Sequence, residues 1–116
     1  MVVDDAIDTL DLFREMLSGL GHQAILADSG YEALKLLEQS PLPDLIFMDI
    51  QMPVMSGTET LSLVRKRYRD IKVVAQSAHA LVGDRDRFLN DGYDEYLPKP
   101  FSMDQLARII SILFPS

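Results

Sequence analysis

The sequence predicts an α/β fold in which a parallel sheet is covered on both faces by helices. Two observations lead to this expectation. Short apolar runs of the strand type alternate with longer segments whose apolar residues recur at helical spacing, and this strand–helix unit occurs five times. Each helix returns the chain to the same end of the sheet, so consecutive strands run parallel. The 116 residues fit one domain, residues 1–116, with no linker or repeat.

The first two units occupy residues 1–39. The first strand is expected at Met1–Val3, and the helix after it has Asp8 as its predicted N-cap and Gly21 as its stop. The second strand is expected at His22–Ala27, followed by a helix that opens on a capping box at Ser29. The helical spacing of the first unit is carried by Leu10, Phe13, Leu17 and Leu20.

The third and fourth units follow two prolines that break the chain. A strand is expected at Leu45–Met48, and the helix after it opens on a second capping box, at Ser56. The fourth strand, Ile71–Gln76, is of the buried type. Its helix is expected at Val82–Asp91, ending at Gly92.

The last unit combines a weaker strand with a strongly patterned helix. The strand is expected at Tyr93–Leu97, and a capping box at Ser102 opens the helix. The predicted inner face of this helix consists of Leu106, Ile109, Ile110 and Leu113.

Composition excludes several classes of function. The net charge of -7, from 18 acids and 11 bases, argues against direct binding to nucleic acid or to an anionic membrane. The absence of cysteine excludes disulfides, thiolate zinc sites and a cysteine nucleophile. No apolar run approaches the roughly 20 residues that span a bilayer. The acidic start does not resemble a signal peptide, so a cytoplasmic domain is expected.

Polar side chains follow four of the predicted strands at the point where each strand ends. Asp4 and Asp5 follow the first strand, Asp49 the third, Ser77 the fourth and Lys99 the fifth. Taken singly, each is an ordinary turn, cap or loop residue. Because the carboxyl ends of parallel strands meet at one edge of the sheet, where such folds bind ligands, we expect these side chains to lie together.

The charges of this group predict a metal ion and phosphate chemistry. Three neighbouring carboxylates repel one another, and a hard divalent cation such as Mg²⁺ relieves this repulsion through oxygen ligands. One such ion and the Lys99 ammonium together cancel the three negative charges. A metal ion and a lysine can then neutralise phosphoryl oxygens while a carboxylate attacks the phosphorus.

Four segments together resemble the response-regulator receiver domains of two-component signalling, over essentially the whole chain. These segments are Val2–Asp5 (VVDD), Pro43–Gly57 (PDLIFMDIQMPVMSG), Ser77–Ala80 (SAHA) and Gly92–Phe101 (GYDEYLPKPF). The sequence around Asp49 and Lys99 is most similar to that of receivers attached to hybrid histidine kinases. The resemblance implies a doubly wound, flavodoxin-like (βα)5 fold with strand order 2-1-3-4-5.

The resemblance also assigns the central acids and their metal. Asp49 would accept a phosphoryl group from a histidine on a partner protein. Mg²⁺ would be bound directly by Asp5, Asp49 and the backbone carbonyl of Gln51, and through water by Asp4. The partner would be a histidine kinase or a histidine phosphotransfer protein, and the domain would be a monomer or a phosphorylation-dependent dimer.

Further roles follow from the same resemblance. Lys99 and Ser77 would stabilise the phosphoryl group, and the Lys99–Pro100 peptide bond would be cis. Ser77 and Tyr96 would form a switch that remodels the face made by the fourth helix, the fifth strand and the last helix. Gln76 stands where receivers more often have an apolar residue, and the sequence gives no physical reason for it.

Two other functions stay open at this stage. One is a magnesium-dependent phosphatase that uses Asp49 as its nucleophile. Such enzymes place a general acid two residues after the nucleophile, and this chain has Gln51 there, so no separate substrate turnover is expected. The other is a degenerate interaction module that takes up no phosphate, against which the complete acidic set argues.

Overall fold

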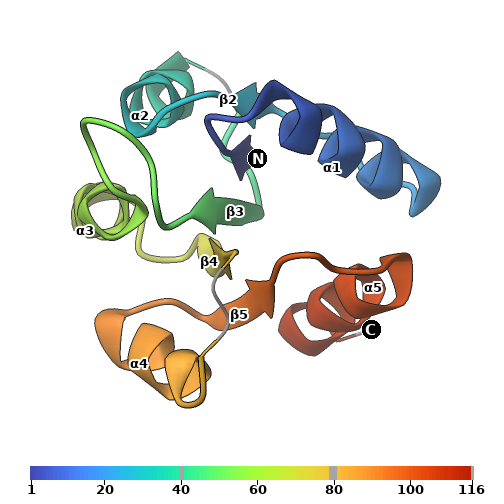
Figure 1. Cartoon of the computed structure of the whole chain (residues 1–116). Helices are drawn as coiled ribbons and strands as arrows, with labels where there is room; N and C mark the ends of the chain where they lie inside the picture. The colour runs from blue at the N-terminus through green and yellow to red at the C-terminus, as the bar shows by residue number, and fades with distance from the viewer. Residues whose placement is uncertain (40, 79–80, 116) are drawn as a thin grey trace.

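The computed structural model describes residues 1–39, 41–78 and 81–115 and contains one five-stranded sheet. All strand pairings are parallel, and the order is β2-β1-β3-β4-β5, as the resemblance implied. Figure 1 shows the strands side by side through the centre of the molecule. The strands are β1 (Val2–Val3), β2 (Leu26–Ala27), β3 (Leu45–Asp49), β4 (Lys72–Ser77) and β5 (Glu95–Pro98).

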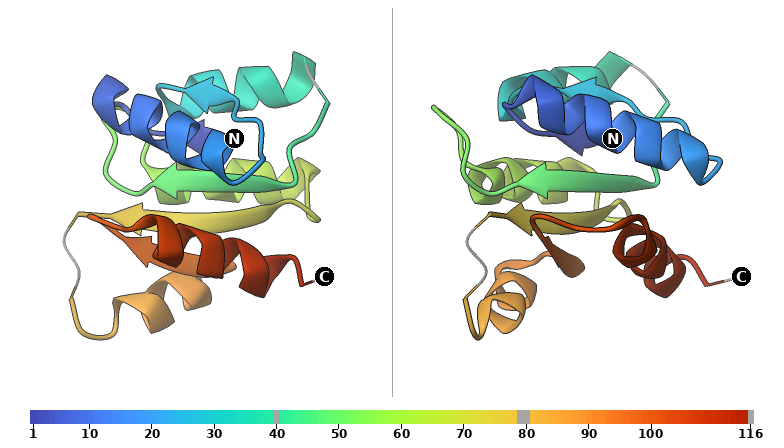
Figure 2. Two further views of the ribbon diagram at one scale, coloured as in Figure 1. Left: turned by 90° about the vertical axis from the view of Figure 1, so that its right-hand side faces the viewer. Right: turned by 45° about the vertical axis from the view of Figure 1, so that its right-hand side comes forward.

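Helices cover both faces of the sheet, which confirms the predicted layers. In Figures 1 and 2, α1 and α5 lie on one face and α2, α3 and α4 on the other. None of the helices in residues 1–39, 41–78 and 81–115 is long and apolar enough to cross a membrane. The helices are α1 (Ile7–Gly19), α2 (Gly30–Gln39), α3 (Gly57–Arg67), α4 (Asp84–Asp91) and α5 (Met103–Leu113).

Each face of the sheet buries its own apolar cluster because successive side chains of a strand point to opposite faces. The cluster under α1 and α5, here called the α1/α5 core, contains Val2, Phe47, Val74 and Leu97 from the strands. The cluster under the other three helices contains Val3, Met48, Val73 and Ala75 from the same strands. Both faces are apolar, so the strands read as continuous hydrophobic runs rather than alternating ones.

Serine side chains cap three helices as predicted, and one predicted cap is wrong. At the start of α2, Oγ of Ser29 accepts a hydrogen bond from the backbone N–H of Glu32 at 3.0 Å, and the Glu32 carboxylate accepts one from the backbone N–H of Asp28 at 3.3 Å. Ser56 and Ser102 form complete capping boxes at the starts of α3 and α5. Asp8 is not an N-cap, because α1 already begins at Ile7. Instead, the Asp4 carboxylate accepts a hydrogen bond from the backbone N–H of Ala6 at 2.9 Å. An acid further upstream thus provides a hydrogen-bond acceptor for a backbone N–H at the start of this helix.

Several predicted boundaries also differ from the structure. The second strand is only Leu26–Ala27 instead of His22–Ala27, because it pairs with β1, which itself has two residues. The helix expected from Val82 begins at Asp84, because Gly83 has a φ of 88°, which a helix interior does not accommodate. The fifth strand is shifted to Glu95–Pro98.

The amino edge of the sheet is held together by one carboxylate. Oδ2 of Asp94 accepts a hydrogen bond from the Val73 backbone N–H at 2.8 Å and from the Arg65 guanidinium at 2.6 Å. This atom therefore ties the end of α3, the start of β4 and the segment before β5 to one another. At the opposite, carboxyl edge, the ammonium of Lys99 pairs with the carboxylates of Asp4 and Asp49.

Candidate functional site

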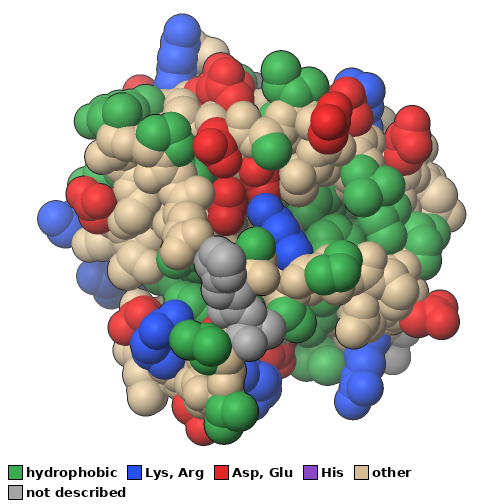
Figure 3. All heavy atoms as spheres, viewed as in Figure 1, with side chains coloured by type: hydrophobic (Ala, Val, Ile, Leu, Met, Phe, Trp, Pro, Cys, Tyr) green, Lys and Arg blue, Asp and Glu red, His purple; other side chains and the backbone are tan. Residues whose placement is uncertain are grey.

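Three carboxylates meet at the carboxyl edge of the sheet. Asp4 and Asp5 follow β1, and Asp49 is the last residue of β3. One oxygen from each carboxylate lies within 4.8 Å of the others. Asp4 and Asp49 are buried and Asp5 is exposed, so the cluster opens to solvent on the side of Asp5. On the face of the molecule in Figure 3, acidic side chains gather around a basic one near the centre of the view.

Lys99 supplies the positive charge from the end of β5. Its Nζ lies 2.6 Å from Oδ2 of Asp4 and 3.8 Å from Oδ1 of Asp49. Its backbone N–H donates to the carbonyl of Ser77 at 2.9 Å, which continues the pairing of β4 with β5. The Lys99–Pro100 peptide bond is cis. The sheet thus joins residues 95 positions apart in the sequence into one ion-paired group.

Asp4 and Asp5 differ in how their oxygens are used. Both oxygens of Asp4 have protein donors: the backbone N–H of Ala6 for Oδ1 and the Lys99 ammonium for Oδ2. Asp5 is exposed next to the cluster. The Asp5 carboxylate is therefore the more accessible of the two to an incoming cation.

The Asp49 carboxyl loses its proton less readily than an ordinary aspartate in the metal-free protein. Burial raises the pKa of Asp49 from 3.8 to about 6, and the Asp4 carboxylate raises it as well. The Lys99 ammonium and a hydrogen bond from the backbone of Gln51 lower this pKa but do not offset the other effects. The predicted repulsion among the acids is thus visible at Asp49.

The backbone around Asp49 is packed tightly from two sides. The N–H of Ile50 donates to the carbonyl of Gln76 at 3.0 Å, and the N–H of Gly57 donates to the carbonyl of Ile50 at 2.9 Å. A Cβ on Gly57 would lie 2.2 Å from the carbonyl oxygen of Asp49. The start of α3 therefore rests directly on the backbone of Asp49. Sequence reasoning missed this role of Gly57, whose only signal is a glycine directly after a capping serine.

Ser77 and Tyr96 lie on the sheet face covered by α4. Ser77 is buried at the end of β4, one residue after Gln76, which pairs with Asp49 of β3. The ring of Tyr96 packs 5.1 Å from that of Phe88 on α4. The Tyr96 hydroxyl is buried and has no hydrogen-bond partner within the described parts of the chain. Burial raises the pKa of Tyr96. The remaining residues of the SAHA segment, His79 and Ala80, lie outside the described residues.

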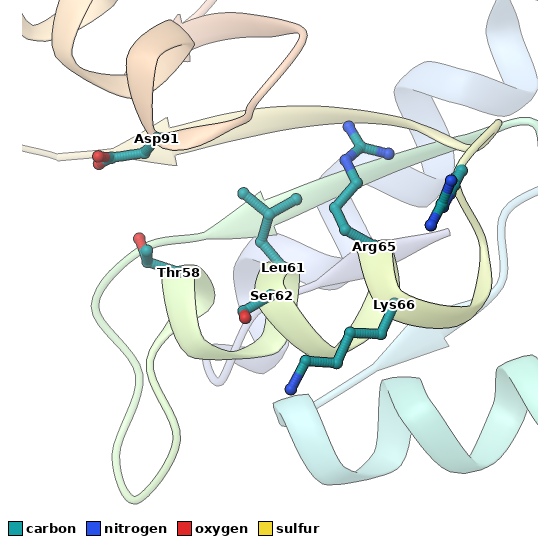
Figure 4. A pocket seen from close by; sticks show the side chains of 7 residues that line it. Thr58, Leu61, Ser62, Arg65, Lys66 and Asp91 are labelled. Carbon is teal, nitrogen blue, oxygen red and sulfur yellow. The ribbon is translucent and has the colours of Figure 1, made fainter.

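The acid cluster fits a hard divalent cation. Its donor set is carboxylate oxygen only, close enough together to share one ion, and one side opens to water, as an ion that keeps several waters requires. A hollow of about 560 Å³ elsewhere, along α3, is lined mainly by basic and neutral residues such as Arg65 and Lys66, with Asp91 as its acidic residue (Figure 4). The Arg65 guanidinium is already paired with Asp94, so the acid cluster is the better candidate site.

Comparison with curated proteins gives a response regulator and a sensor histidine kinase among the relatives. The chain is 37% identical over 112 residues to the polar-differentiation response regulator DivK of Brucella ovis, covering 95% of this chain and 90% of that protein. It is 34% identical over 115 residues to the sensor histidine kinase GacS of Pseudomonas protegens. That match covers 95% of this chain but spans only 12% of the kinase.

Solved structures agree with these relatives. The receiver domain of Francisella response regulator 1452 superposes with a TM-score of 0.85 at 31% identity, covering 97% of this chain and 92% of that one. Vibrio cholerae chemotaxis protein CheY4 superposes with a TM-score of 0.88 at 25% identity, covering 97% and 95%. The family model of the response regulator receiver domain matches residues 1–111. With its sheet order, its edge of three acids and one lysine, and these relatives, the chain belongs to the response regulator receiver domains of two-component signalling.

Proposed function

We propose that Asp49 accepts a phosphoryl group from a phosphohistidine on a histidine kinase or a histidine phosphotransfer protein. The observation that carries this proposal is the buried Asp49 carboxylate, with the Lys99 ammonium 3.8 Å away, inside a cluster of three acids. A carboxylate nucleophile flanked by a cation site and a lysine suits phosphoryl transfer, which needs positioning and charge neutralisation more than covalent chemistry.

The transfer exchanges one bond to phosphorus for another. An oxygen of ionised Asp49 attacks the phosphorus, and the bond between phosphorus and the donor imidazole nitrogen breaks. The electron pair of that bond stays on the nitrogen, so the donor leaves as a histidine that takes a proton from solvent when its pKa requires it. The product is an aspartyl phosphate on Asp49.

Residues of this chain hold the reacting groups in place. Lys99 pairs with the Asp49 carboxylate and would then contact the phosphoryl oxygens. Asp5, Asp49 and the Gln51 carbonyl would hold Mg²⁺, with Asp4 acting through water. When bound, Mg²⁺ supplies charge neutralisation for the carboxylates and the phosphoryl oxygens. Ser77, at the end of β4, would donate its hydroxyl to a phosphoryl oxygen.

Incubation with acetyl phosphate and Mg²⁺ should add one phosphoryl group to the wild-type protein and none to Asp49→Asn. The reason is that the amide of Asn lacks the negative oxygen that attacks phosphorus. Intact-mass spectrometry of both proteins measures the addition. Equal labelling of the two proteins would refute the assignment of Asp49, and no labelling of the wild type would favour the degenerate interaction module.

Replacing Asp5 with Asn should weaken Mg²⁺ binding more than replacing Asp4 with Asn. Both oxygens of Asp4 already have protein donors, whereas the Asp5 carboxylate is exposed to the cation. Loss of an indirect partner weakens metal binding on the order of tenfold, and loss of a direct ligand should exceed this. Calorimetric titration of the two variants decides the order. Equal or reversed losses would contradict the direct role of Asp5.

We further propose that phosphorylation acts on the surface formed by α4, β5 and α5 through Ser77 and Tyr96. Two observations support this: Ser77 directly follows Gln76, the residue that pairs with Asp49 across the sheet, and the buried hydroxyl of Tyr96 has no hydrogen-bond partner among the described residues. When Ser77 moves toward the phosphoryl group, it vacates space that the Tyr96 ring can fill by turning inward. The phosphoryl group then favours one of two pre-existing states, because only that state makes the new hydrogen bond.

Ser77→Ala should still accept phosphate but lose most of the structural response. A hydrogen bond to a charged group contributes about 1.5–3 kcal/mol, so its loss shifts the balance of states about tenfold to a hundredfold. Amide chemical shifts with and without beryllofluoride, which mimics the aspartyl phosphate, measure the response. Wild-type-like shifts over residues 81–97 in Ser77→Ala would remove Ser77 from the switch.

The proposal includes no separate enzymatic turnover and places the domain in the cytoplasm, where kinases that use ATP supply the donor. An aspartate-based phosphatase needs a proton donor for its leaving group, and the residue two positions after Asp49 is Gln51. Only trace hydrolysis of a small phosphoester such as p-nitrophenyl phosphate is therefore expected. Sustained turnover would favour the phosphatase instead.

A further inference from the structure

A row of polar side chains crosses four neighbouring strands at the carboxyl edge of the sheet. We call it the polar row, and its members are Asp4, Asp49, Gln76 and Lys99. Strand alternation places all of them on the sheet face covered by α1 and α5, since the residue two positions before each belongs to the α1/α5 core. Those preceding residues are Val2, Phe47, Val74 and Leu97.

Within the polar row, Gln76 lies between Asp49 and Lys99. Asp49 pairs with Gln76 across β3 and β4, and Gln76 pairs with Leu97 across β4 and β5. The Lys99 ammonium lies 2.6 Å from the Asp4 carboxylate. Lys99 follows β5 and Asp4 follows β1, and β4 and β3 lie between these two strands. The Lys99 side chain therefore crosses the end of β4. Gln76 is the last residue of β4 on that face, because Ser77 belongs to the other one.

The side chain of Gln76 is buried, and only one of its two polar atoms has a hydrogen-bond partner among the described residues. It is 1% exposed, and its Nε2 donates to the carbonyl of Leu97 at 3.2 Å. This bond fixes the orientation of the amide, because the opposite orientation would bring two oxygens together. Oε1 has no partner among the described residues. A buried oxygen without a partner destabilises the folded state, and an apolar residue would avoid this cost.

We propose that Gln76 is a positioning residue for phosphoryl transfer, whose Oε1 accepts a hydrogen bond from the Lys99 ammonium when that ammonium leaves Asp4 for the phosphoryl group. An ammonium has three donors, so Lys99 can contact a phosphoryl oxygen, Asp49 and Gln76 together. The amide would then hold the ammonium over β4, beside Asp49. This inference rests on the proposed function and explains a residue that the sequence left without a physical reason.

The test replaces Gln76 with Met, which has nearly the same shape but lacks the amide oxygen. We expect phosphoryl uptake from acetyl phosphate at saturating Mg²⁺ to slow on the order of tenfold, because a hydrogen bond to a charged group is lost. Intact-mass spectrometry over time measures the rate of uptake. Val74→Ala is the matched control: it removes packing two residues earlier on the same face, so it should lower stability and leave the uptake rate unchanged. Gln76→Leu replaces Gln76→Met if the latter does not fold.

A double-mutant cycle with Lys99→Met separates positioning from a purely structural effect. If Gln76 acts through the ammonium, Gln76→Met should have no further effect on the residual uptake rate of Lys99→Met. A wild-type rate in Gln76→Met, or the same slowing with and without Lys99, would overturn the inference and leave the proposed function standing. Absence of uptake by the wild type would overturn both.

Discussion

Gly57→Ala should destabilise the protein by about 4 kcal/mol or more and abolish phosphoryl uptake, because the new methyl group has no space. Its Cβ would lie 2.2 Å from the carbonyl oxygen of Asp49 and 2.9 Å from the Cα of Ile50. Both atoms belong to the backbone, which cannot move aside as the end of a side chain can. To fold, the variant would have to separate α3 from β3, and this would displace the Asp49 carboxylate.

Urea denaturation followed by circular dichroism measures this loss, with Gly19→Ala as the matched control. Gly19 is in the last turn of α1, and the nearest atom to an added Cβ is the end of Met103 at 3.5 Å. Gly19→Ala should therefore change stability by less than about 1 kcal/mol, in the stabilising direction expected for alanine in a helix. Similar unfolding midpoints for the two variants would show that α3 does not rest on Asp49.

Asp49→Asn should make the metal-free protein more stable than the wild type, by about 2–3 kcal/mol near neutral pH. The pKa of Asp49 is raised from 3.8 to about 6 in the folded protein, so the folded state binds the proton more tightly than the unfolded state does. Ionised Asp49 thus destabilises the fold above pH 6, and this effect fades as the pH falls toward 3.8. Asn has a similar shape and no charge to bury.

Denaturation of both proteins at several pH values, in EDTA, measures this difference. The advantage of Asp49→Asn should be largest at about pH 7–8, should shrink as the pH falls from about 6 toward 3.8, and should disappear only at about pH 3 or below, where the wild-type carboxyl is protonated in both states. Added Mg²⁺ should stabilise the wild type and reduce the gap. A gap that does not change with pH would mean that the ionisation of Asp49 has no part in it.

The layers of the fold were predictable from the sequence, whereas the lengths of its edge elements were not. Helical spacing and the capping boxes at Ser56 and Ser102 are local signals, and the structure confirms them. The length of β2 depends on its partner: residues 22–25 have an extended pattern, but the parallel ladder begins only at Leu26, opposite Val2 at the start of β1. The helix α4 was predicted to start at Val82, but Gly83 has a positive φ and precedes the first helical residue, Asp84.

The acid cluster was predictable because strand ends in a parallel sheet converge, so position in the chain determines which polar residues meet. Asp4, Asp49 and Lys99 come together as expected. The unused oxygen of Gln76 and the contact of Gly57 with the Asp49 backbone were not predictable, because they depend on register and on distances of a few ångströms. No periodic pattern in the sequence encodes such distances.

The carboxylate of Asp94 determines where this domain can deform. It fixes the start of β4, the end of α3 and the segment before β5 to one another at the amino edge. We therefore expect β4 and β5 to move least at the amino edge, where Asp94 joins them, and more at their carboxyl ends. If Asp49 is phosphorylated as proposed, we expect the change to spread to the carboxyl ends of β4 and β5 and the start of α4 more than to the amino edge of the sheet.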